Sequence, residues 1–140
     1  MLVVDYAARL RSQSKSPREF MWAALLHDIG KPDTTRVRKG RITSYDHDVV
    51  GAKIAEEFLL SFTKDTDFIK RVTNLIRYHM QILFVVKDMP YQDIPGIRQH
   101  VDIDELALMG FADRMGRTNA DEEEVKHIIH EFVQKLNDKN

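Results

Sequence analysis

The sequence has no cysteine among its 140 residues. This absence excludes disulfide bonds, zinc–thiolate sites and cysteine nucleophiles, so histidine, aspartate and glutamate remain as possible metal ligands. The sequence also lacks any apolar run near the roughly 20 residues that span a membrane, and its N-terminus has neither the basic segment nor the cleavage site of a signal peptide. We therefore expect a cytoplasmic protein with no membrane contact.

A large net charge of either sign is missing as well. The 21 lysine and arginine residues nearly balance the 22 aspartate and glutamate residues, which leaves a formal net charge of -1, and 43% of the residues are hydrophobic. A chain of this composition is neither disordered nor a general nucleic-acid binder, so any attraction for anions has to be local. The length is that of one domain, which we expect to comprise residues 1–140.

Apolar residues recur at helical spacing through most of the chain, which predicts an all-α domain of about six or seven helices with short connections. The helices are expected over residues 1–11, 17–30, 46–62, 65–79, 102–117 and 120–136, with shorter pieces at 83–86 and 97–100. Ser16 and Glu19 have the spacing of a capping box, with Pro17 at the first helical position. Asp102 or Asp104 is expected to cap the helix that follows.

Helical spacing is lost between residues 35 and 45, where Lys39 and Gly40 predict the turn of a short hairpin or an ordered loop. Basic residues dominate residues 31–41, where Lys31, Arg36, Arg38, Lys39 and Arg41 are accompanied by one acidic residue, Asp33. A local positive field of this kind attracts a nucleotide or an RNA end. The alternative is a solvated hairpin with no such role.

His27 and Asp28 lie side by side at the end of an apolar helix, and Asp113 interrupts the apolar stretch that begins at residue 106. An ionised carboxylate in apolar surroundings is costly unless a cation or several donors meet it. Alone, His27 reads as a hydrogen-bonded core residue, and Asp113 as a partner of Arg117 or a residue just outside the core. Together they supply the mixed nitrogen and oxygen ligands of a divalent-metal site.

Several short motifs follow one another along the chain. They are Leu26-His27-Asp28-Ile29-Gly30-Lys31-Pro32, then Gly40, His47 with Gly51-Ala52, His79-Met80, and Ala112-Asp113-Arg114-Met115-Gly116-Arg117. In this order they resemble the HD superfamily of metal-dependent phosphohydrolases, and most of all the HD domain attached to bacterial tRNA nucleotidyltransferases. The resemblance extends from Met1 to about Arg117, and it implies a single HD-type helical domain.

The resemblance also implies one or two divalent metal ions, without distinguishing Mn, Mg, Fe, Ni or Zn. His27, Asp28 and Asp113 match the family's ligands to the first metal. His47 and His79 fall where its ligands to a second metal lie, with Asp28 bridging the two. For His47 and His79, an exposed histidine at a helix end is the alternative interpretation.

The first histidine of the family pattern would lie about two residues before Met1. Asp5 lies roughly 10 Å too far along the helix to replace it. The resemblance therefore leads us to expect that the chain begins within the first family helix. Three protein ligands with open positions for water can still hold a catalytic metal.

These features predict a metal-dependent phosphohydrolase, either a phosphatase or a phosphodiesterase, that acts on a nucleotide, a cyclic phosphate or an RNA end. Asp28 and Lys31 are the candidate catalytic residues. Lys31, Arg114 and Arg117 are the candidate phosphate contacts, because cationic side chains bind phosphate oxygens strongly. Ordinary surface cations are the alternative for all three.

Two other interpretations remain open at this stage: an RNA-binding module, and an interaction domain with an incomplete metal site. The presence of all five potential metal ligands favours the enzyme, because a scaffold does not require them. The absence of the family's first histidine favours the other two. The expected partner is thus a phosphorylated small molecule or nucleotide, or RNA, and the oligomeric state stays open.

Overall fold

The computed structural model describes residues 2–27, 36–38, 41–43, 47–116 and 120–138, and the side chains of these ranges except those of residues 2, 36–38, 41–43, 47–48 and 138. The helices are α1 (Leu2–Leu10), α2 (Pro17–Leu26), α4 (His47–Leu60), α5 (Thr66–Tyr78), α6 (Gln81–Val86), α7 (Ile94–His100), α8 (Ile103–Met115) and α9 (Glu122–Asp138), with a 3-10 turn, η1, at Arg11–Gln13. The all-α class is confirmed. The short α6 and α7 occupy the region where two short helical pieces were predicted.

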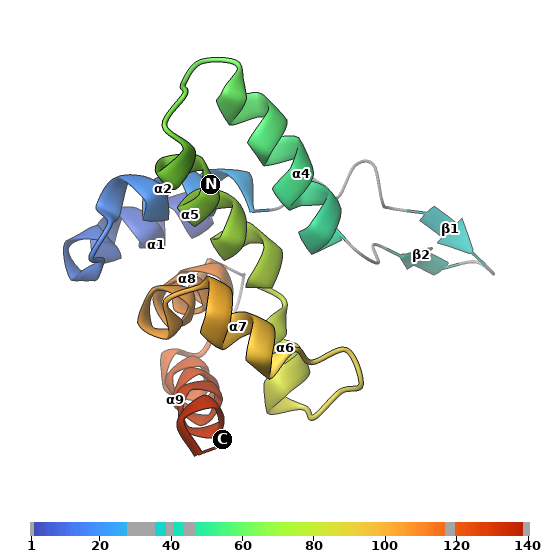
Figure 1. The fold of residues 1–140 in the computed structure, drawn as a ribbon. Coiled ribbons are helices and arrows are strands. Elements are labelled where there is room, and N and C mark those ends of the chain that lie inside the picture. Colours follow the sequence, from blue (N-terminus) through green and yellow to red (C-terminus); the bar gives the residue numbers. More distant parts are fainter. Residues whose placement is uncertain (1, 28–35, 39–40, 44–46, 117–119, 139–140) are drawn as a thin grey trace.

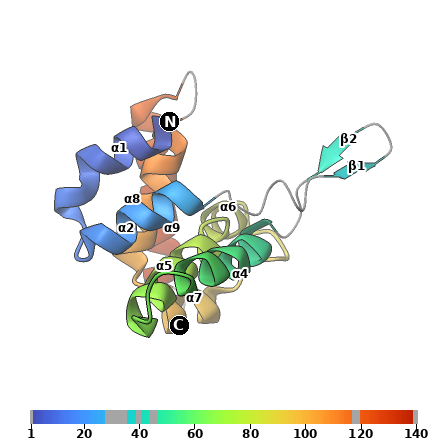
Figure 2. The same cartoon turned by 90° about the horizontal axis from the view of Figure 1, so that it is seen from above.

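Two strands, β1 (Arg36–Arg38) and β2 (Arg41–Thr43), pair antiparallel in the basic region. Val37 lies opposite Ile42, and Arg38 lies opposite Arg41 across the turn. The predicted hairpin is therefore formed, although its turn at residues 39–40 lies outside the described residues. It extends away from the helices in both views (Figures 1 and 2).

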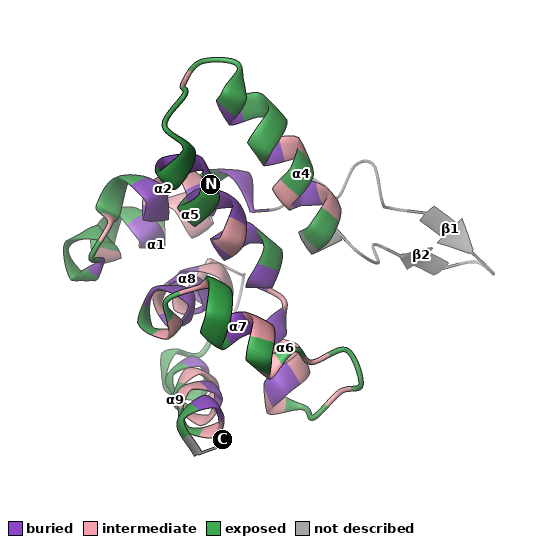
Figure 3. Cartoon of the chain, in the orientation of Figure 1, coloured by how far each residue is buried: buried purple, intermediate pink, exposed green. Residues whose placement is uncertain are grey.

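Helix α2 contacts α1, α5 and α8, while α4 packs on α5 and α9 packs on α8 and α6 (Figure 1). Each of these helices carries buried residues (Figure 3). The largest of them are Phe20, Leu59, Ile76, Ile82, Ile97, Leu106, Met109, Phe132 and Leu136. None of the helices in the described ranges is long and apolar enough to cross a membrane.

Aspartates begin two of the long helices. The Asp65 carboxylate accepts a hydrogen bond from the Phe68 N–H at 3.1 Å and thereby caps α5. Asp102 caps α8 by accepting from the N–H groups of Asp104 at 2.9 Å and Glu105 at 3.2 Å. Both caps satisfy backbone donors that a helix leaves without partners. Of the two predicted alternatives for α8, Asp102 is the cap.

The predicted capping box at the start of α2 is wrong, although Pro17 does occupy the first turn as expected. The Ser16 side chain makes no capping hydrogen bond. Glu19 is instead buried, and its carboxylate accepts from Arg71 of α5 at 2.7 Å. A charge-assisted bond to a guanidinium is stronger than one to a backbone N–H, so this tertiary partner prevails over the local pattern.

Candidate metal centre

His27 directly follows α2 and is 1% exposed. Its Nδ1 lies 2.7 Å from the carbonyl oxygen of Ala24, one turn earlier in the same helix. A carbonyl can only accept, so Nδ1 carries a proton and donates it. Nε2 is then the ring atom that is able to coordinate a metal, and the helix end fixes its direction.

The Nε2 atom of His27 lies 3.1 Å from Oδ1 of Asp113 in α8. In the neutral ring both atoms are acceptors, and two lone pairs facing each other at this distance repel. The contact becomes favourable when a positive species joins it, either a proton on Nε2 or a cation that both atoms bind. The side chain of Asp113 is 18% exposed, so this positive species would be partly shielded from water.

His79 repeats the local arrangement of His27. It directly follows α5, is 5% exposed, and its Nδ1 donates to the carbonyl oxygen of Ile76, one turn earlier. The centroids of the His27 and His79 rings lie 5.5 Å apart, with the rings nearly perpendicular at 87°. Two helices that are distant in sequence therefore end with imidazoles in contact, each with Nδ1 bound to its own helix.

The structure thus brings together three of the predicted site residues: His27, His79 and Asp113. The described partner of Asp113 is His27, the Asp113 side chain is partly exposed, and Arg117, the other partner considered for it, lies outside the described residues. Arg114 follows it and is partly buried. His47 begins α4 as predicted, but its side chain is not among those that the structure describes. Three other predicted site residues, Asp28, Lys31 and Arg117, lie entirely outside the described residues. Among the side chains that the structure describes, no three histidine or acidic residues form a complete metal-binding group.

Sequence reasoning missed the contact that ties α1 to this site. A Cβ atom added to Gly116 would lie 2.7 Å from the backbone nitrogen of Val3 and 2.8 Å from its Cα. Only glycine lets the two backbones approach this closely. The beginning of α1 therefore packs against the end of α8, one turn beyond Asp113. The signal for it was Gly116 itself, at the end of the Ala112–Arg117 motif.

The sequence profile of the HD domain family matches residues 1–118. The match covers most of the chain, and the chain therefore belongs to the HD domain family. This family includes metal-dependent phosphohydrolases.

Several curated relatives match part of the chain, and two of them are tRNA nucleotidyltransferases. The chain is 39% identical over 71 residues to the CC-adding tRNA nucleotidyltransferase of Thermus thermophilus, a match covering 49% of this chain and 16% of the relative. It is 34% identical over 95 residues to the A-adding tRNA nucleotidyltransferase of Deinococcus radiodurans, covering 66% and 21%. The Multifunctional CCA protein of Actinobacillus pleuropneumoniae serotype 5b is 33% identical over 79 residues, covering 56% and 19%. The chain thus spans about a fifth or less of each relative's length.

Proposed function

We propose that this protein is a metal-dependent phosphohydrolase that cleaves a phosphate ester. The observation that carries the proposal is the contact between His27 Nε2 and Asp113 Oδ1, at 3.1 Å, with the His79 ring beside it. Nitrogen and oxygen ligands of this kind suit divalent first-row metals. The membership of the HD domain family supports the same reading.

The residues fit a divalent metal because His27 and His79 each have Nδ1 bound to a backbone carbonyl, as metal-ligating histidines usually do. His27, Asp28 and Asp113 would hold the first ion. His47 and His79 would serve a second, with Asp28 shared. When bound, such an ion lowers the pKa of water and neutralises charge on a phosphoryl oxygen.

The chain's own cations would position the substrate. Lys31, Arg114 and Arg117 are the residues that we assign to the phosphate, with Lys31 beside the leaving oxygen. Asp28 would be the carboxylate closest to the reaction, because it adjoins His27 in sequence. The buried setting of His27 excludes water from one side of the site, which strengthens electrostatic contacts to a phosphate on the other.

The substrate class that we propose is a nucleotide, a cyclic phosphate or an RNA end. The support is indirect: the named relatives act on tRNA, and they match this chain over a small share of their length. The hairpin adds to it, because its register places Arg38 opposite Arg41. A local excess of cationic residues on the two strands attracts phosphate groups.

The test combines metal content with activity. The purified protein, supplied with Mn²⁺, is assayed on a phosphomonoester and on a 2′,3′-cyclic nucleotide, and bound metal is measured by mass spectrometry. We expect His27→Ala and Asp28→Ala to lower both metal content and activity, by at least about 100-fold for activity, since even losses around a metal's ligands cost about 10 to 100-fold. His130→Ala is the matched control, because this histidine is exposed on α9. Unchanged metal content in the two site variants would refute the proposal.

A second candidate is an RNA-binding module without catalysis. The observation that favours it is the basic hairpin, which projects from the helices (Figure 2). This candidate predicts that Arg38→Ala with Arg41→Ala weakens binding to a tRNA acceptor stem, while His27→Ala does not. The enzyme predicts that His27→Ala abolishes turnover and that the hairpin variants affect KM alone.

A further inference from the structure

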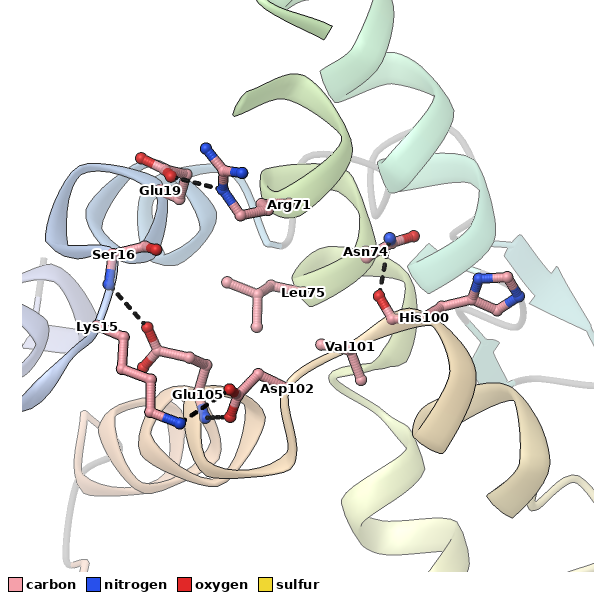
Figure 4. Close-up of a pocket in the computed structure, with 10 residues that line it drawn as sticks. All are labelled: Lys15, Ser16, Glu19, Arg71, Asn74, Leu75, His100, Val101, Asp102 and Glu105. Carbon is pink, nitrogen blue, oxygen red and sulfur yellow. Dashed lines mark hydrogen bonds and ion pairs between the residues drawn. The ribbon is translucent and has the colours of Figure 1, made fainter. Parts of the chain in front are cut away.

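The first turns of α2 and α8 are joined by a buried carboxylate. Glu105 is 8% exposed, and its Oε1 accepts hydrogen bonds from the Ser14 hydroxyl at 2.6 Å and from the Ser16 N–H at 3.0 Å. Beside it, Lys15 Nζ contacts Asp102 Oδ2 at 3.0 Å. Ser16, Glu105, Lys15 and Asp102 line a cavity of about 250 Å³ between the two helices and α5 (Figure 4). We call Ser14, Ser16 and Glu105 the Glu105 junction.

The same two helices meet again near their other ends. His27 follows the last residue of α2, and Asp113 lies in the last turn of α8, with the 3.1 Å contact between them. From Glu105 to Asp113 the helix rises roughly 12 Å, and from Ser16 to His27 roughly 16 Å. The two helices are therefore fixed to each other at two points, and the Glu105 junction is the one remote from the candidate metal centre.

We propose that Glu105 is a positioning residue for the candidate metal centre: it fixes how α2 lies on α8, and thereby the separation of His27 from Asp113. The proposal rests on the proposed function. Packed helices move as rigid bodies, because protein interiors are close-packed and transmit strain. A shift at the junction is therefore carried to the far ends of both helices. Metal ligation is sensitive to such shifts, since ligand distances hold within about 0.2 Å.

Glu105 rather than the neighbouring ion pair carries this role. The side chains of Lys15 and Asp102 are 65% and 43% exposed, and exposed pairs fix geometry weakly. The Glu105 carboxylate is buried and binds two donors that come from a segment 89 to 91 residues away in the chain. Its loss leaves the buried Ser14 hydroxyl without this acceptor and the Ser16 N–H with its remaining bond to Ser14 Oγ, so the corner between α1 and α2 has to move until the hydroxyl finds another acceptor.

The experiment compares three variants of the full chain. Glu105→Leu removes the acceptor at similar volume, and Glu105→Gln keeps an oxygen acceptor for Ser14 and Ser16. The matched control is Arg98→Met, which removes a side-chain bond from α7 to the Leu136 carbonyl in α9, away from both ends of α2. For each variant we measure Mn²⁺ affinity by titration, the ring ¹⁵N chemical shifts of His27 without metal, and the unfolding midpoint.

We expect Glu105→Leu to weaken Mn²⁺ binding by about 10-fold or more and to move the His27 ring signals. Glu105→Gln and Arg98→Met should leave both near the wild-type values. The proposal is overturned when Glu105→Leu lowers the unfolding midpoint as Arg98→Met does, yet leaves affinity and ring signals unchanged. If the wild type binds no Mn²⁺, the proposed function fails, and the ring signals alone decide about Glu105. If Glu105→Leu does not fold, Ser14→Ala replaces it.

Discussion

The two ends of α2 handle buried polar groups in opposite ways. At its beginning, each buried carboxylate meets donors: Glu19 accepts from Arg71 at 2.7 Å, and Glu105 accepts from Ser14 at 2.6 Å. At its end, Nε2 of a buried histidine faces the Asp113 carboxylate instead. At the beginning acceptors are bonded to donors, whereas at the end two groups that both bind cations face each other. The first arrangement is typical of a structural polar cluster and the second of a candidate metal site.

The largest effect on this difference between the two ends of α2 is expected from Asp113→Asn. The amide can donate to His27 Nε2, so the facing acceptors become a hydrogen-bonded pair. At pH 8, where an ordinary histidine is neutral, we expect the metal-free protein to gain about 1 kcal/mol of stability. Metal affinity should fall by at least about 100-fold, because an amide carries no charge. Urea unfolding with a chelator and a Mn²⁺ titration measure the two effects.

A loss of stability in metal-free Asp113→Asn at pH 8 would contradict the reading of this contact. It would mean that the Asp113 carboxylate is already paired with a positive charge in the metal-free protein. Asp104→Asn serves as the control, because that carboxylate is exposed in the first turn of α8.

The next largest effect is expected at Gly116. Gly116→Ala places a methyl group against the Val3 backbone, so α1 has to move away from the end of α8. Overpacking of this kind typically costs about 1 to 3 kcal/mol, measurable as a lower urea midpoint. Gly110→Ala is the comparison, because its new methyl group would meet only the side-chain ends of Ile82 and Ile129. Equal losses of stability in the two variants would show that the backbone contact between Gly116 and Val3 is no more important than the side-chain contacts at Gly110.

A smaller effect on stability is expected at Asp102, which caps α8 beside the Glu105 junction. Burial raises the pKa of Asp102, but the hydrogen bonds from Lys15 and from the backbone N–H groups of α8 outweigh it and hold the pKa below 3.8. A carboxyl group with a lowered pKa in the folded state stabilises the protein above its ordinary pKa, and this contribution is lost as the pH falls through the folded value. Asp102→Ala should therefore cost about 1 kcal/mol at pH 7, and less at pH 3.

Urea unfolding at the two pH values measures this difference. Asp102→Asn is the matched variant, since asparagine also caps helices but does not titrate. It should keep most of the stability at pH 7 and lose the dependence on pH that Asp102 causes. An unchanged pH dependence in Asp102→Asn would exclude this carboxylate as its source.

Local signals predicted the helices well, because they depend on residues close together in sequence. Asp65 and Asp102 each begin a helix where an aspartate preceding an apolar stretch predicts one, and two short helices fall around Pro90 and Pro95. The meeting of His27, His79 and Asp113 was implied by the family pattern, and their contacts agree with it.

The errors and omissions concern contacts between distant segments. Glu19 has the spacing of a capping box, but its partner Arg71 lies 52 residues away and is invisible to a local pattern. In the sequence, Glu105 looks like any acidic residue in the first turn of a helix, where a negative charge stabilises the helix by interacting with its dipole. Its bonds to Ser14 and Ser16 depend on how two helices pack, and no single segment encodes that.

The close approach of Val3 to Gly116 has a practical consequence for handling the protein. Residues joined ahead of α1 would emerge about one helical turn from Asp113, whereas the C-terminus lies at the far end of α9 (Figure 1). An N-terminal polyhistidine tag would thus bring foreign imidazoles to the very groups whose metal content is to be measured. Metal analyses of this chain should use a C-terminal tag, or one that is cleaved before the first titration.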